Sequence, residues 1–140
     1  MSEIIIADAG PLVAYLDRSD HHHAWAQEAM ASLTEPMWSC EAALAEASFL
    51  LHRGGIKPGG LITMVERGIL KIPLNLEKEA GAIRQLLERY SNVPMSLADA
   101  CIVRLSELQQ QARVFTTDSD FAIYRRNGRK VIPLLAPWRG

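Results

Sequence analysis

Short apolar runs alternate with segments of helical periodicity along all 140 residues, and this alternation limits the possible folds most strongly. The expected strands, several of them rich in β-branched residues, lie at 3–8, 37–40, 69–74, 113–117 and 131–135. The expected helices lie between them at 11–16, 20–33, 41–53, 58–67, 76–90, 96–109 and 119–127. No short hairpin connection is expected. The pattern therefore predicts an α/β protein whose mostly parallel sheet is covered by helices on both faces.

The size and composition of the chain fit one globular domain spanning residues 1–140. Hydrophobic residues make up 49% and charged residues 22%, which is enough apolar surface to exclude a disordered chain. With only two cysteines, a disulfide scaffold is not expected. Cys40 and Cys101 are instead predicted to be small buried core residues.

Nothing in the sequence predicts export or membrane insertion. The N-terminus has no basic segment, and its apolar run is far shorter than a signal sequence requires. No stretch approaches the roughly 18–20 apolar residues of a membrane span. We therefore expect a cytoplasmic protein without membrane association.

The net charge of −1 identifies no partner, but the charge is unevenly distributed. Residues 121–140 carry five basic residues and no acid, whereas the remaining residues have a net charge of −6. This asymmetry fits either a basic edge beside an acidic site or simply a solvated helix end.

Two aspartates directly follow apolar runs, at the places where expected strands end. Asp8 comes after Ile4–Ala7, and Asp118 comes after 113–117, with Asp120 two residues further on. The carboxyl ends of parallel strands meet at one edge of a sheet, where ligands bind, so these acids are expected to lie close together. Each could alternatively cap the helix that follows it.

Two further acids lie in apolar helices. Glu46 is the only charged residue in 42–51, and no Lys or Arg lies three or four positions away. A glutamate buried in such a helix is costly unless it is paired or metal-bound. Asp99 stands in the sequence Ser96-Leu-Ala-Asp99, which is typical of a capping box, so a structural explanation competes with a functional one.

Four carboxylates converging on one sheet edge favour a hard divalent cation. Mg²⁺ or Mn²⁺ prefers oxygen ligands, and such an ion could activate water and hold a phosphate for attack. Zinc is disfavoured, because His21–His23 are adjacent, His52 is isolated, and neither has the spacing of a zinc site.

Taken together, these acids and their surroundings resemble the PIN-domain nucleases, most closely the VapC-type toxins of toxin–antitoxin pairs. The family pattern begins with a strand ending in Asp, a small residue and an apolar helix, as in Ile4-Ile-Ile-Ala-Asp8-Ala-Gly10-Pro. Three further motifs follow in the family order: Glu46 in an apolar helix, Asp99 opening another, and Thr116-Thr-Asp118-Ser-Asp120-Phe121.

The resemblance implies an α/β/α sandwich and a Mg²⁺- or Mn²⁺-dependent endoribonuclease that acts as a toxin. It implies that the catalytic and metal-binding acids are Asp8, Glu46, Asp99 and Asp118. Gly10 would keep the approach to the first acid open, Thr117 would orient the last, and Asp120 would be auxiliary. RNA as substrate, a small antitoxin over the site groove and a homodimer are also implied. Arg125, Arg126 and Arg129 are then expected to contact the RNA backbone.

Alternative interpretations are a non-catalytic PIN scaffold that binds RNA or a partner, and a PIN nuclease of RNA processing without an antitoxin. Phosphatase and receiver modules also place an Asp after the first strand. The phosphatase pattern needs a second Asp where Gly10 stands, and the receiver pattern needs paired acids at the first strand, which are missing, and a late Lys. Lys130 begins its expected strand rather than ending it, so both interpretations are disfavoured.

Overall fold

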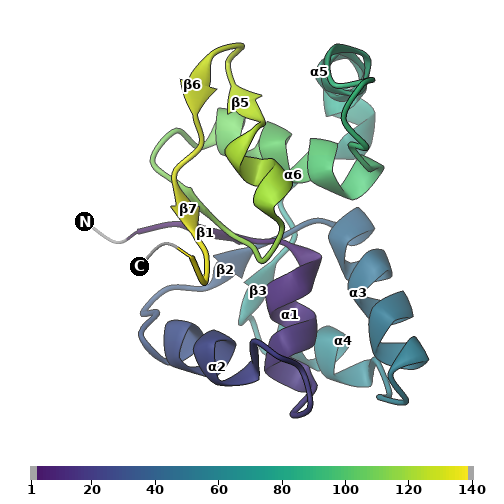
Figure 1. Ribbon diagram of the computed structural model, residues 1–140, viewed down its shortest axis with the longest axis vertical. Helices are drawn as coiled ribbons and strands as arrows, with labels where there is room; N and C mark the ends of the chain where they lie inside the picture. Colours follow the sequence, from purple (N-terminus) through teal and green to yellow (C-terminus); the bar gives the residue numbers. More distant parts are fainter. Residues whose placement is uncertain (1–2, 139–140) are drawn as a thin grey trace.

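A five-stranded sheet forms the centre of the protein, with strand order β3-β2-β1-β4-β7 and every neighbouring pair parallel (Figure 1). A computed structural model describes residues 3–138. The strands of this sheet are β1 (Ile5–Ala7), β2 (Met37–Trp38), β3 (Leu70–Lys71), β4 (Arg113–Phe115) and β7 (Leu134–Leu135). The prediction of a mostly parallel sheet is confirmed.

Helices cover both faces of the sheet, as predicted (Figure 1). They are α1 (Ala9–Leu16), α2 (His23–Ala31), α3 (Glu41–Arg53), α4 (Gly59–Glu66), α5 (Leu76–Arg89) and α6 (Leu97–Leu108). None of the helices in the described range is long and apolar enough to cross a membrane.

Alternation of side chains along β1 divides the core into two halves. Ile6 packs with residues of α5 and α6, whereas Ile5 and Ala7 pack with residues of α1, α2 and α4. Successive residues of a strand point to opposite faces, so a run that is apolar at every position is buried on both sides. The three-residue strand β1 is fully buried for this reason.

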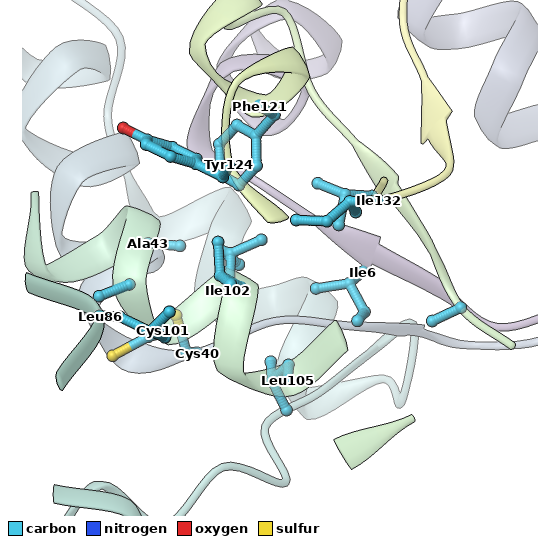
Figure 2. Close-up of a cluster of buried hydrophobic side chains, with 14 of the residues drawn as sticks. Ile6, Cys40, Ala43, Leu86, Cys101, Ile102, Leu105, Phe121, Tyr124 and Ile132 are labelled. Carbon is cyan, nitrogen blue, oxygen red and sulfur yellow. The ribbon is translucent and has the colours of Figure 1, made fainter. Parts of the chain in front are cut away.

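The half of the core on the α6 side contains both cysteines (Figure 2). Cys40 and Cys101 are free and buried, which confirms that they act as core residues and not as a structural disulfide. Phe121 and Tyr124 are fully buried in the same cluster, with their ring centres 5.2 Å apart in a T-shaped arrangement. The segment after β4 is therefore anchored firmly to the sheet.

The predicted helix at 119–127 is wrong. The chain forms only a 3-10 helix, η1 (Ser119–Ala122), and then an antiparallel hairpin of β5 (Arg125–Arg126) and β6 (Lys130–Val131). Asn127 and Gly128 at the turn both have positive φ, at 52° and 85°. Asn-Gly is the strongest short-range sequence signal for such a turn, and the expectation of no hairpin overlooked it.

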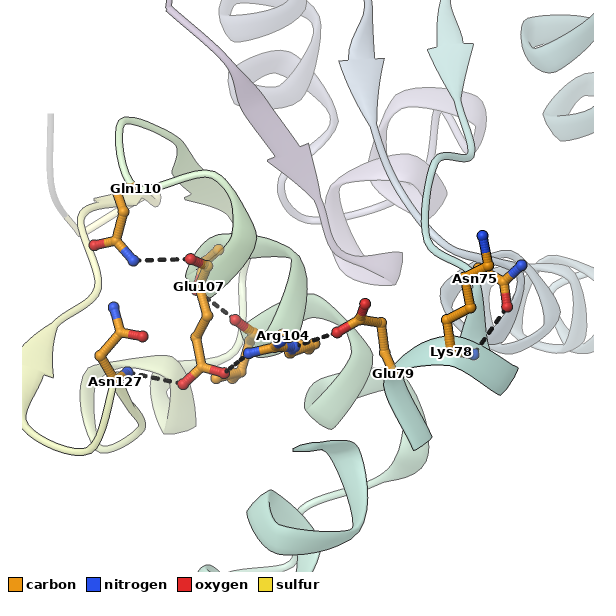
Figure 3. A network of polar contacts seen from close by, with 9 residues as sticks. Asn75, Lys78, Glu79, Arg104, Glu107, Gln110 and Asn127 are labelled. Atoms are coloured by element: carbon orange, nitrogen blue, oxygen red, sulfur yellow. Dashed lines mark hydrogen bonds and ion pairs between the residues drawn. The ribbon is translucent and has the colours of Figure 1, made fainter. Parts of the chain in front are cut away.

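A polar network attaches α5 and the hairpin to α6 (Figure 3). Arg104 on α6 pairs with Glu79 on α5 at 2.7 Å and with Glu107 on its own helix at 3.1 Å. The backbone N–H of Asn127 donates to the other oxygen of Glu107 at 2.8 Å. The turn of the hairpin is thus fixed to the helix that carries Asp99.

Candidate active site

Asp8, Asp99 and Asp118 meet at one edge of the sheet. Each offers a carboxylate oxygen, and these three oxygens lie within 4.8 Å of one another. Asp8 directly follows β1 and Asp118 follows the neighbouring parallel strand β4, while Asp99 lies in the first turn of α6. The strand ends bring the first two together, and the packing of α6 on β1 and β4 adds the third.

Thr116 positions two of these acids at once. Its hydroxyl donates to Asp8 Oδ2 at 2.8 Å and accepts the backbone N–H of Asp118 at 2.9 Å. Burial raises the pKa of Asp8 to about 7, with smaller contributions from Asp99 and Glu46, although the Thr116 hydrogen bond works in the opposite direction. A carboxylate that is so costly to ionise has a strong preference for a nearby cation.

Asp99 combines a capping role with a place in the acidic cluster. Its side chain accepts the N–H of Ser96, and its own N–H donates to the Ser96 hydroxyl, so the predicted capping box is present. The buried Tyr124 hydroxyl also donates to Asp99 Oδ2 at 3.1 Å. Burial is the main cause that raises the pKa of Asp99, and the charge of Asp118 adds to it.

Glu46 lies at the exposed rim of the cluster, and the expectation that its part of α3 is buried is wrong. Ala45, Phe49 and Leu50 are exposed on the same helix. Only the face of α3 that carries Ala47 and Leu51 packs against the core. The apolar composition of this helix therefore did not mean that all of its sides are buried. Partial desolvation, followed by the charges of Asp99 and Asp118, raises the pKa of Glu46, which places its carboxylate within electrostatic reach of the cluster.

Of the three auxiliary residues, Gly10 lies in the first turn of α1, Asp120 lies in η1, and Thr117 lies in the loop between β4 and η1. The Thr117 side chain packs against Gly10. The hydroxyl that accepts the backbone N–H of Asp118 is that of Thr116, one position earlier than the expected Thr117. The backbone N–H of Asp120 donates to Asp118 Oδ1 at 2.9 Å, whereas its own carboxylate is not one of the three grouped ligands.

Gly10→Ala is expected to lower the free energy of unfolding by about 1–3 kcal/mol. A Cβ at this position would lie 2.1 Å from the Thr117 hydroxyl oxygen. Urea unfolding measures the loss, and a second Ala at Thr117 should restore most of it. Gly81→Ala is the control, because a Cβ there meets nothing within 4 Å. Equal stability of the Gly10 and Gly81 variants would contradict the clash.

The arginines of the basic tail do not form one exposed surface. Arg126 is buried, contrary to expectation, and its guanidinium donates to the carbonyls of Ser106, Gln110 and Ala112. The Arg125 guanidinium donates to three carbonyls at 122–124, at the end of η1. Arg129 and Lys130 are exposed on the hairpin, and Arg139 lies outside the described residues.

Sequence reasoning missed Thr116 and Tyr124, which hold the acids in place. A hydroxyl residue near the end of the strand predicted at 113–117, two positions before a candidate ligand, was a usable signal for Thr116. Tyr124 had no such signal, because its contact with Asp99 depends on how η1 packs against α6.

The metal-free protein is expected to lose stability as the pH rises from about 4 to about 7. Asp8 keeps its proton in the folded state up to a pKa of about 7, whereas the unfolded chain releases it near 3.8. This difference corresponds to up to about 4 kcal/mol. Thermal melts in EDTA at several pH values measure it, and Asp8→Asn should flatten the dependence. If wild type and Asp8→Asn show the same dependence of melting temperature on pH across this range, Asp8 is already ionised in the folded protein and the prediction is wrong.

Comparison with known proteins identifies the family. The PIN domain family matches residues 5–127, and the chain therefore belongs to the PIN domain family. Among solved structures, the fold is similar to that of Mycobacterium tuberculosis VapC20, described as a toxin that cleaves the sarcin–ricin loop. The TM-score is 0.74 at 19% sequence identity, over 85% of this chain and 93% of that one. No curated protein matches the sequence significantly.

Proposed function

We propose that this protein is a Mg²⁺- or Mn²⁺-dependent endoribonuclease and the toxin of a toxin–antitoxin pair. The observation that carries this proposal is the group of three carboxylates, Asp8, Asp99 and Asp118, at the carboxyl edge of a parallel sheet. Membership of the PIN domain family and the structural similarity to VapC20 support it.

The cluster fits a hard divalent cation. Its three ligands are carboxylate oxygens, which Mg²⁺ and Mn²⁺ prefer, and two of them are at most 6% exposed. Among residues 3–138, Asp8 and Asp99 have no ion pair with a basic side chain. Such an ion, when bound, supplies an activated water and stabilises the charge that develops on the phosphate.

The side chains around the acids keep them in position for that ion. The Thr116 and Tyr124 hydroxyls each donate to one carboxylate, and Ser96 fixes the helix turn from which Asp99 projects. Preorganised ligands need no rearrangement when substrate arrives. Glu46, which is exposed, adds a fourth carboxylate within electrostatic reach of Asp99 and Asp118.

RNA contact by the basic tail is proposed mainly through Arg129. Its side chain is exposed on the hairpin, together with Lys130. Arg125 and Arg126 bind backbone carbonyls with their guanidinium groups, which leaves them fewer donors for phosphate. A small antitoxin over the site, a homodimer, a single domain over residues 1–140 and a cytoplasmic location remain predictions of the same proposal.

Cleavage of total cellular RNA by the purified protein tests the proposal. We expect discrete fragments with Mn²⁺ or Mg²⁺ and none with EDTA. Isothermal titration with Mn²⁺ provides a separate measure of metal binding. A protein that binds Mn²⁺ and RNA but cleaves no RNA would instead support the non-catalytic PIN scaffold.

A further inference from the structure

One exposed face of α3 extends from the acidic cluster to the end of the helix. Glu46, Phe49 and Arg53 lie at positions i, i+3 and i+7, which place them along one side of an α-helix. The Phe49 side chain is 59% exposed, and the Arg53 guanidinium carbon lies 5.7 Å from the centre of its ring. We call these three residues the α3 stripe.

A pocket of about 480 Å³ lies beside the α3 stripe, and Arg53 is the residue of the stripe that lines it. Its walls come from α1, α3 and the loops beside them, and α1 and α3 pack against each other (Figure 1). Gly10 and Thr117 also line it; in the sequence they stand two residues from Asp8 and one residue from Asp118. Arg53 and His22 line it too. The volume is within the range of small-ligand sites.

The charges around this pocket suit a nucleotide better than an isolated phosphate. Arg53 pairs with no carboxylate in the described range, so its charge is available to a phosphate. Asp17 and Asp20 also line the pocket, where they accept hydrogen bonds from the backbone N–H groups of Ser19 and His22. Carboxylates can accept further hydrogen bonds from sugar hydroxyls or base amino groups.

We infer that the α3 stripe and this pocket bind a nucleotide of single-stranded RNA adjacent to the cleaved bond. Phe49 provides a surface on which a base stacks, and Arg53 contacts a backbone phosphate. The pocket beside Arg53 holds the sugar that is joined to this phosphate. An exposed aromatic ring next to a cation is the usual combination for single-stranded nucleic acid. The inference rests on the proposed function, because it assigns RNA to the same site.

A second copy of the chain is the competing occupant of this face. Phe49 and Leu50 are exposed apolar side chains, as at many subunit interfaces. However, the same face carries the charges of Glu46 and Arg53, and charged residues are depleted at the centres of such interfaces. The polar pocket beside it also favours a polar ligand.

Equilibrium binding of a fluorescein-labelled, unstructured RNA oligonucleotide in EDTA tests the inference without cleavage. Arg53→Ala is expected to weaken binding about tenfold and to reduce the slope of log Kd against log salt by about 0.7. Phe49→Ala is expected to weaken binding about 5- to 150-fold with the slope unchanged, and Phe49→Tyr should retain affinity. Arg67→Ala, which removes an exposed arginine at the end of α4, is the matched control.

The outcomes separate the inference from the proposed function. Equal RNA affinities of the Arg53 and Arg67 variants would overturn the subsite, even if the wild type cleaves RNA. Thermal melts identify any variant that has not folded. If Phe49→Ala changes the sedimentation of the protein and not its RNA affinity, the face is an interface between copies and the inference is wrong. Failure of the wild type to cleave RNA would count against the proposed function alone.

Discussion

Asp99→Asn is expected to abolish RNA cleavage, with a rate loss on the order of 1,000-fold, equivalent to about 4 kcal/mol of activation free energy. Asp99 is one of the three carboxylates whose oxygens lie within 4.8 Å. An amide oxygen is a weaker ligand for Mg²⁺ or Mn²⁺ than a carboxylate. The measurement is the initial rate of Mn²⁺-dependent cleavage, together with Mn²⁺ affinity by titration.

The same variant separates the metal role of Asp99 from its capping role. Asparagine caps helices about as well as aspartate, and it can still accept a hydrogen bond from Ser96 or Tyr124. Loss of a charge beside Asp118 also relieves repulsion, so the metal-free melting temperature should be unchanged or higher.

The control for Asp99→Asn is Glu77→Gln, which makes the same charge change in the first turn of α5 at an exposed position. It should alter neither cleavage nor Mn²⁺ affinity. If Asp99→Asn cleaves RNA at the wild-type rate, both the assigned site and the proposed nuclease mechanism are incorrect.

Arg126→Ala is expected to lower the free energy of unfolding by about 3 kcal/mol and the melting temperature by on the order of 10 °C. The buried guanidinium donates to carbonyls at the end of α6 and in the turn before β4. Truncation of Arg126 leaves these buried carbonyls without hydrogen-bond donors. This loss lowers the free energy of unfolding more than the loss of an exposed charge does. Urea unfolding measures the change.

Arg129→Ala provides the matched comparison, because it removes the same side chain from an exposed position on the same hairpin. Its free energy of unfolding should stay within about 0.5 kcal/mol of the wild type. Its RNA affinity should fall, with a salt slope smaller by about 0.7. If Arg126→Ala were as stable as Arg129→Ala, the interpretation of Arg126 as a structural residue would be wrong.

Elements with strong local signals were predicted closely from the sequence. The helix α3 occupies 41–53 as expected, because an Ala- and Leu-rich segment ends at two glycines, the second with φ of 79°. The strands in the structure are shorter than the predicted ones. The reason is that a strand is defined by hydrogen bonds to a neighbouring strand and not by apolar character alone. At 119–127 the competing signal was Asn-Gly, whose turn geometry prevailed over weak helical periodicity.

The sequence by itself determined the sheet and the acids at its edge. A short run that is apolar at every position predicts a strand buried on both faces of a parallel sheet. An Asp that follows each of two neighbouring parallel strands lies at their shared edge, so Asp8 and Asp118 could be predicted to lie close together without a structure. The capping box around Asp99 was likewise local, since it spans four residues.

Only the tertiary structure decided which neighbours hold those acids and which side chains remain exposed. Thr116 reaches Asp8 across 108 positions of sequence, and Tyr124 reaches Asp99 across 25. Arg126 and Arg129 are the same residue type three positions apart, yet one is buried against carbonyls and the other is in solvent. Local sequence sets backbone preference and charge, whereas burial and long-range hydrogen bonding depend on what the rest of the chain packs against each side chain.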